Sequence, residues 1–311
     1  MGLVRVAVAA LAGAALVRDT EGFAGFGSRP KPAKGKPKKG KGGLAPDAAK
    51  ILDKANGNLD AAQGMLFQQQ AMKLKDKDPA LFRAMETHAA GTPMPDAMHE
   101  KLVELTWDTV AAYLPVTASR APADDVKEKL RAIAVACGEG AVLDVGCGDG
   151  AIIPFLKERG LEADDYVGVD VSGRMIDVAR ATHKKFKFVQ GNFMTDDSSG
   201  DEPKYDCVLF NGSLQFATDV AAMLRRAKGC LREGGRIVIA HANGAAFVRD
   251  EQRGNPNVVQ SLMPGEEELA ALGEEVGLSV ADIDNNLDLD SDEFYLEVLE
   301  QVALGEIRRV Q

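Results

Sequence analysis

The chain has 311 residues and a formal net charge of −10, with 47 acidic and 37 basic residues. Residues 1–43 hold nine of the basic residues and two of the acidic ones. The remainder therefore carries 28 basic and 45 acidic residues, a net charge of −17, which excludes a general nucleic-acid binder because phosphate neutralisation needs clustered Lys and Arg. No run of 18 apolar residues occurs, so we predict no membrane span.

Residues 1–43 have the composition of a targeting presequence. Arg5 precedes an apolar run from Val6 to Val17, which has the length of a signal-peptide core and is too short to cross a bilayer. The following stretch contains Phe23 and Phe26 and then seven basic residues without an acid, and we expect it to be disordered. The pattern resembles the bipartite presequence of plastid proteins in algae with secondary plastids. A mitochondrial presequence, or secretion followed by a basic linker, are the alternatives.

Residues 44–135 are predicted to form a helical accessory region. An amphipathic pattern through Ile51 and Leu52 breaks at Asn56-Gly57-Asn58 and resumes from Leu59 to Phe67. Further helices are predicted over residues 80–89 and 99–113. Two short helices with a glycine turn are too common to assign a binding function.

Residues 142–150 predict a strand that runs into a ligand-binding loop. An apolar strand containing Asp144 breaks into alternating glycines, which allow tight turns and close approach to a ligand. Gly146, Gly148 and Ala151 also satisfy the fingerprint of dinucleotide-binding folds. However, Asp144 and Asp149 would repel a pyrophosphate, whereas S-adenosylmethionine brings an ammonium and a sulfonium. The loop therefore favours S-adenosylmethionine.

A second strand is predicted over residues 166–170, followed by a helix through Met175 and Ile176. It ends at Asp170. Because the carboxyl ends of strands face the ligand crevice of a doubly wound sheet, Asp170 can accept hydrogen bonds from both ribose hydroxyls. A solvated acid at a strand end is the alternative.

From about Trp107 to the C-terminus, the chain resembles the class I S-adenosylmethionine-dependent methyltransferases. Residues 186–193 are similar to the third strand of that family and to the polar residue that reads the adenine edge. Here that residue is Asn192, where many members have Asp. Residues 205–215 are similar to the fourth strand with its loop, and residues 231–241 to the fifth strand. The resemblance implies that the cofactor is bound by Asp144, Val145, Gly146, Cys147, Gly148, Asp170, Val171, Asn192, Phe193 and Asn211.

The resemblance also implies an α/β fold: a doubly wound, Rossmann-like, seven-stranded sheet with helices on both faces, preceded by the small helical region. We divide the chain into a presequence (1–43), a helical accessory or lid region (44–135) and a methyltransferase domain (136–311). The segments His241–Gly244, Leu262–Pro264 and Glu293–Leu299 resemble a plant and algal organellar subgroup.

Catalytic candidates lie at the ends of the fourth and fifth strands. His241 is the best-placed general base, because strand-end residues face the crevice, although a loop-capping hydrogen bond would also explain it. Asn211 could orient the acceptor or the methionine portion, and Gln215 and Phe216 could line the acceptor pocket. In related enzymes an N-terminal helix covers the substrate site. Trp107 and Tyr113 are therefore lid candidates, with ordinary helix packing as the alternative.

Neither a disulfide framework nor a metal site is predicted. The cysteines Cys137, Cys147, Cys207 and Cys230 lack paired metal spacing. Acidic residues between Asp282 and Glu293 match the ligand spacing of a calcium loop, but Leu287 stands where the sharp turn requires glycine.

Three functional classes remain open. The first is a methyltransferase acting on a small organic acceptor, which we favour. An Asn/Asp-Pro-Pro-Tyr tetrad is absent after the fourth strand, where residues 211–214 read Asn-Gly-Ser-Leu, and this argues against methylation of amides or exocyclic amines. The second is a methyltransferase acting on protein or RNA through the helical region. The third is a non-catalytic nucleotide-binding protein that kept the fold.

Overall fold

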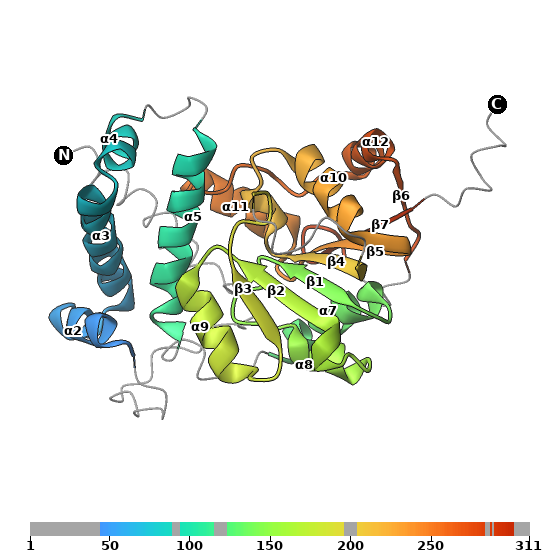
Figure 1. The fold of residues 1–311 in the computed structure, drawn as a ribbon, viewed down its shortest axis with the longest axis horizontal. Helices are drawn as coiled ribbons and strands as arrows, with labels where there is room; N and C mark the ends of the chain where they lie inside the picture. Colours follow the sequence, from blue (N-terminus) through green and yellow to red (C-terminus); the bar gives the residue numbers. More distant parts are fainter. Residues whose placement is uncertain are drawn as a thin grey trace.

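A seven-stranded sheet forms the centre of the protein (Figure 1). The computed structural model describes residues 44–88, 94–114, 123–195, 204–283, 287 and 289–301. The strand order is β3-β2-β1-β4-β5-β7-β6, and β7 runs antiparallel to both of its neighbours. The strands are β1 (Val142–Val145), β2 (Tyr166–Asp170), β3 (Lys187–Gln190), β4 (Tyr205–Asn211), β5 (Leu231–His241), β6 (Leu278–Val280) and β7 (Tyr295–Gln301).

The central strands are buried on both faces because they read as nearly continuous apolar runs. On one face, α7 (Asp124–Cys137), α8 (Ile153–Glu158) and α9 (Gly173–Thr182) pack through an apolar cluster that includes Ile133, Phe155 and Ile176. On the other face, α10 (Val220–Cys230), α11 (Gly244–Gly254) and α12 (Glu266–Val276) contribute Leu224, Val248 and Leu269 to a second cluster. The sheet is therefore a middle layer between two helical layers.

Four further helices form a cap beside the sheet, shown blue to blue-green in Figure 1. They are α2 (Pro46–Lys54), α3 (Leu59–Lys77), α4 (Pro79–Thr87) and α5 (Asp96–Ala111). Phe67, Phe82 and Leu102 share an apolar cluster in which Val171 and Phe216 of the sheet region also pack. Helix α5 thus lies between the outer cap helices and the end of the sheet.

The predicted fold class is confirmed. The predicted helical breaks at residues 56–58 and the strands at residues 142–145, 166–170 and 205–211 agree with the elements that form. The domain boundary at residue 135 stays a prediction. Residues 1–43, for which we predict a presequence, lie outside the described residues, as does part of the acidic segment with calcium-like spacing. Within the described residues, no group of three or more His, Cys, Asp and Glu side chains could hold a metal ion.

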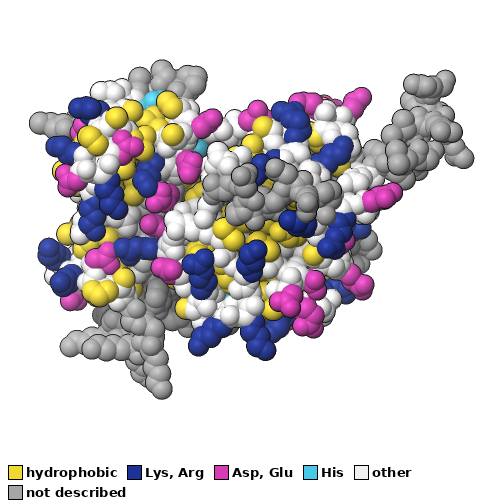
Figure 2. All heavy atoms as spheres, in the orientation of Figure 1, with side chains coloured by type: hydrophobic (Ala, Val, Ile, Leu, Met, Phe, Trp, Pro, Cys, Tyr) yellow, Lys and Arg dark blue, Asp and Glu magenta, His cyan; other side chains and the backbone are white. Residues whose placement is uncertain are grey.

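The surface in Figure 2 carries basic and acidic side chains interspersed over the cap and the sheet region. In the part of the chain that the structure describes, none of the helices combines the length and the apolar character required to cross a membrane.

Candidate functional site

The glycine loop after β1 and the end of β2 form one hydrogen-bonded unit. The N–H groups of Gly146 and Cys147 donate to the Val169 carbonyl at 2.8 and 3.1 Å. Asp170 accepts from the Gly148 N–H through Oδ2 at 2.9 Å and from the Ser172 N–H through Oδ1 at 2.8 Å. Asp170 therefore holds both the glycine loop and the start of α9 at the carboxyl end of the sheet.

The glycine loop is tightly packed at Gly146 and open at Gly148. Gly146 has φ +72°, and a Cβ added there would lie 2.4 Å from the Ser213 Cβ, because the loop after β4 packs directly against it. Gly148 has φ +54°, and nothing described lies within 4 Å of an added Cβ. The loop can thus be approached closely by a ligand at Gly148.

Buried carboxylates surround the loop. Asp144 is 2% exposed; its Oδ2 accepts a 2.7 Å hydrogen bond from the Tyr166 hydroxyl, whereas its Oδ1 has no partner among the described residues. Burial raises the pKa of Asp144 to about 7, against the effect of the Tyr166 hydrogen bond, and the neighbouring Asp170 raises it further. Burial likewise raises the pKa of Asp170 to about 6, against its two backbone hydrogen bonds. A cationic ligand would relieve this concentration of negative charge.

We expect Asp144→Asn to flatten the dependence of stability on pH. The folded-state pKa near 7 lies above the unfolded value near 3.8, so the folded state binds the proton more tightly, and the stability this provides is lost as the pH rises towards 7. One pKa unit corresponds to about 1.4 kcal/mol. Between pH 5 and pH 8, the wild-type free energy of unfolding should therefore fall by about 2–3 kcal/mol more than that of the variant.

Denaturant unfolding of the protein without ligand at both pH values measures this difference. Asp78→Asn is the matched control, because Asp78 is an exposed carboxylate whose capping bond to the Leu81 N–H an asparagine can keep. Parallel pH profiles for wild type and Asp144→Asn would show that folding does not raise the pKa of Asp144.

The two predicted cofactor-binding residues after β3 lie in different surroundings. Asn192 donates from Nδ2 to Glu100 Oε2 of α5 at 2.8 Å and accepts from the Met194 N–H at 2.8 Å. The buried Phe193 packs edge-on against Phe210 of β4, with 6.2 Å between ring centroids. Glu100 of the cap thus orients the amide of Asn192, while the Phe193 side chain packs in the apolar core.

Asn211 and His241 end the neighbouring strands β4 and β5. Asn211 is half-buried. His241 is 2% exposed, its Nδ1 accepts a 3.3 Å hydrogen bond from the Asn243 N–H, and its ring stacks on Phe247 at 5.2 Å. Burial lowers the pKa of His241 to about 4, so the ring is neutral near pH 7 with its proton on Nε2. The bond from the Asn243 N–H is the loop-capping hydrogen bond given above as the alternative role of His241. The general-base role stays a prediction.

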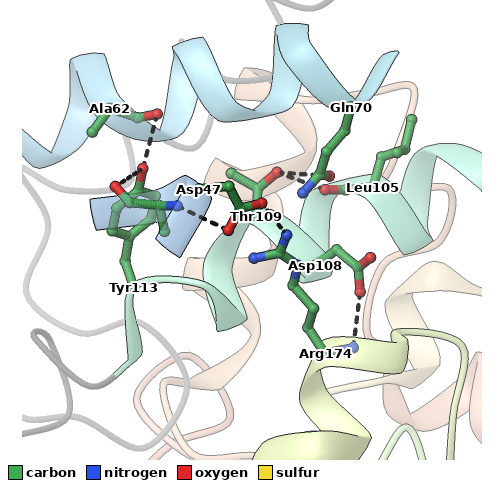
Figure 3. Close-up of polar contacts among 9 residues, drawn as sticks. Asp47, Ala62, Gln70, Leu105, Asp108, Thr109, Tyr113 and Arg174 are labelled. Carbon is green, nitrogen blue, oxygen red and sulfur yellow. Dashed lines mark hydrogen bonds and ion pairs between the residues drawn. The ribbon is translucent and has the colours of Figure 1, made fainter. Parts of the chain in front are cut away.

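Helix α5 of the cap contacts the site through polar bonds that sequence reasoning did not find. Asp108 accepts from the Ser172 hydroxyl at 2.7 Å. It also accepts from the Arg174 N–H at 3.1 Å (Figure 3), so it covers the N-terminus of α9. The Arg174 guanidinium in turn bonds Asp47 of α2 at 2.6 Å. These contacts join the cap to the backbone immediately after Asp170.

The two lid candidates have different positions. Trp107 packs edge-on against Phe216, with 5.7 Å between ring centroids, where α5 meets the segment after β4. Tyr113 is fully buried inside the cap, where its hydroxyl donates to the carbonyls of Ala48 and Ala62 (Figure 3). Trp107 therefore faces the sheet region, and Tyr113 holds the cap together.

We expect Asp108→Ala to loosen the cap at α9. The variant leaves the Arg174 N–H and the Ser172 hydroxyl without this acceptor, which should lower the free energy of unfolding by about 1–2 kcal/mol. Amide hydrogen exchange should also become faster in α5 and in the first turn of α9. Asp124→Ala is the control, because this exposed acid bonds only Lys127 among the described residues. Unchanged exchange in α5 would contradict the role assigned to Asp108.

The comparisons with known proteins agree with this geometry. A family model described as a methyltransferase domain matches residues 143–237. The resemblance to class I S-adenosylmethionine-dependent methyltransferases is thereby confirmed, while the plant and algal subgroup stays a prediction. No curated protein sequence matches the chain significantly.

Solved structures share the fold. One is a protein described as a methyltransferase in complex with the Haloferax volcanii Trm112 methyltransferase activator, with 19% identity, a TM-score of 0.50 and coverage of 64% of this chain and 96% of that chain. The CcbJ methyltransferase from Streptomyces caelestis has 20% identity, a TM-score of 0.45 and coverage of 59% and 92%, respectively. At 19% identity, the likeness to the first of these structures establishes the fold alone.

Proposed function

We propose that this chain, which carries a class I methyltransferase domain over residues 143–237, is an S-adenosylmethionine-dependent methyltransferase. The observation that carries the proposal is the acid-rich glycine loop. Asp144 offers an unpartnered, shielded Oδ1 beneath the loop, and Asp170 and Asp149 add further negative charge beside it. A sulfonium and an ammonium complement this arrangement, and a pyrophosphate does not.

The residues at the ends of the strands fit the parts of S-adenosylmethionine. Asp170 can accept from both ribose hydroxyls and keep its two backbone bonds, because each carboxylate oxygen accepts more than one hydrogen bond. The open approach at Gly148 suits the methionine portion. Val171, Asn192 and the backbone of Phe193 would surround the adenine, since the Phe193 side chain packs in the core. Asn211 would contact the methionine portion or the acceptor.

When bound, S-adenosylmethionine supplies an activated methyl group and a neutral thioether leaving group. The protein has to align the acceptor atom with the methyl carbon and exclude water. The cap supports this role, because Trp107 and Asp108 of α5 cover the segments after β4 and β2. His241, at the end of β5, and Asn211, at the end of β4, are the catalytic candidates that the sequence alone offers.

A small organic molecule is the proposed acceptor. Polar groups of the cap bond the sheet region next to the site: Asp108 and Glu100 of α5 contact Ser172 and Asn192, and Asp47 of α2 pairs with Arg174 of α9. These contacts support a lid more than a docking surface for a macromolecule. The mixed charges on the face in Figure 2 also give a protein or RNA acceptor no particular support.

Calorimetric titration of the full-length chain tests the proposed function. S-adenosylhomocysteine should bind with micromolar affinity, whereas NADH should give no heat of binding. Binding of NADH alone, or of neither ligand, would overturn the methyltransferase proposal, and NADH binding would favour a nucleotide-binding protein without methyl transfer.

A further inference from the structure

Two polar side chains near the end of β4 have unsatisfied oxygens. Gln215, in the short helix η3 (Leu214–Phe216), is 2% exposed and donates from Nε2 to the Gly212 carbonyl at 3.1 Å. Its side chain also hydrogen-bonds the carboxylate of Glu251 on α11. Gln215 Oε1 and Glu251 Oε2 are both shielded from solvent, and neither has a hydrogen-bond partner among the described residues.

Such a pair of oxygens calls for a ligand. Leaving one buried acceptor without a hydrogen bond costs about 1–3 kcal/mol, so most native proteins satisfy these groups. Two unsatisfied oxygens on adjoining side chains therefore indicate a place where an external donor, either water or a ligand, binds. Burial raises the pKa of Glu251 to about 7, so the carboxyl can both release and take up a proton near neutral pH.

The pair adjoins the segments that form the proposed site. Ser213, two residues before Gln215, donates from Oγ to the Val145 carbonyl at 2.5 Å, directly beside the glycine loop. Phe216, the next residue, contacts Trp107 of the cap. Phe247, one helical turn before Glu251, stacks on His241. Along the sheet order β2-β1-β4-β5, Asp170 lies at one end of the site and this pair at the other.

The chemistry of the free atoms specifies the ligand. Both are acceptors, and the Gln215 amide nitrogen is already engaged, so a ligand that satisfies the two oxygens must supply two hydrogens. A hydroxyl has a single hydrogen and can only share it weakly between two oxygens, whereas an amino group donates a separate hydrogen to each, and its cationic form also pairs with the carboxylate. We propose that Gln215 and Glu251 bind the amino group of an aliphatic amine acceptor and that Glu251 takes its proton.

This inference rests on the proposed function. It also accounts for the proton that the amine loses during methyl transfer. The ammonium form of the amine gives one proton to the Glu251 carboxylate, which frees the nitrogen lone pair. The nitrogen then forms a bond to the methyl carbon as the carbon–sulfur bond breaks, and the bonding electrons remain on sulfur. Glu251 later releases its proton to solvent. This assignment moves the base from His241, whose Nδ1 already accepts a hydrogen bond, to Glu251.

Methyl transfer from S-adenosylmethionine carrying a labelled methyl group tests the inference. The full-length chain is given amines paired with alcohols of the same skeleton, such as 2-phenylethylamine with 2-phenylethanol and hexylamine with 1-hexanol. We expect label only in the amines. Glu251→Gln should lower this transfer at least 100-fold while S-adenosylhomocysteine affinity stays within twofold of wild type.

Asp250→Asn is the matched control, because this neighbouring acid on α11 pairs with Arg253 at the surface, and it should transfer at the wild-type rate. Label in alcohols, no label in any amine, or full transfer by Glu251→Gln would overturn the inference while S-adenosylhomocysteine still binds. Loss of S-adenosylhomocysteine binding by the wild-type chain would instead overturn the proposed function.

Discussion

Asp170→Ala should lower the affinity for S-adenosylhomocysteine by at least about 100-fold. A hydrogen bond to a charged group contributes about 1.5–3 kcal/mol, and the proposed complex has two of them between Asp170 and the ribose. The change also removes the acceptor that holds the N–H groups of Gly148 and Ser172, so the glycine loop loses its attachment to β2. Calorimetric titration of the full-length variant measures the loss.

Asp78→Ala provides the comparison for this measurement. Asp78 also accepts a backbone hydrogen bond at a helix start, in α4, but it is exposed and lies in the cap. Its removal should cost stability of about 1 kcal/mol and leave the affinity unchanged. If Asp170→Ala bound S-adenosylhomocysteine as tightly as the control variant does, the ligand would have to bind away from the end of β2.

The sheet was predictable because its signals are local. Strands β1, β2 and β4 are short apolar runs that end in an acid, a glycine or an asparagine, as buried parallel strands do. Strand β6 was not predicted, since it has three residues of which only Leu278 is buried, and its pairing with β7 is a tertiary contact. Helix α11 was missed as well, because its apolar face consists of few residues, among them Phe247 and Val248.

The candidate site likewise has a part that local sequence predicts and a part that depends on contacts between distant segments. The glycine loop and Asp170 follow their strands directly, so spacing alone brings them together. The contacts from the cap join residues far apart in sequence: Asp108 lies 64 positions before Ser172, and Glu100 lies 92 positions before Asn192. An acid on a helix surface carries no sign of such a partner. For the same reason, Gln215 could be proposed as a pocket residue because it closely follows β4, whereas nothing in the sequence indicated Glu251 on α11.

Gly146→Ala should destabilise the protein by about 2–5 kcal/mol and abolish measurable cofactor binding. A residue with a side chain costs about 1–2 kcal/mol in the left-handed region that Gly146 occupies, with φ +72°. The added methyl would also lie 2.4 Å from the Ser213 Cβ, and such overpacking costs about 1–3 kcal/mol. Denaturant unfolding gives the stability, and titration with S-adenosylhomocysteine gives the binding.

Two further variants separate the backbone cost from the clash. Gly234 has φ +76° with nothing within 4 Å of an added Cβ, so Gly234→Ala should show the backbone cost alone. In a double-mutant cycle, Ser213→Gly should recover part of the stability lost in Gly146→Ala, because it removes the carbon that the new methyl meets. If Gly146→Ala and Gly234→Ala were equally destabilised and Ser213→Gly gave no recovery, the loop after β4 would not pack against the glycine loop. The proposed alignment of an acceptor held by Gln215 with a cofactor bound at the glycine loop would then lose its structural basis, since Ser213 joins the two halves of the site.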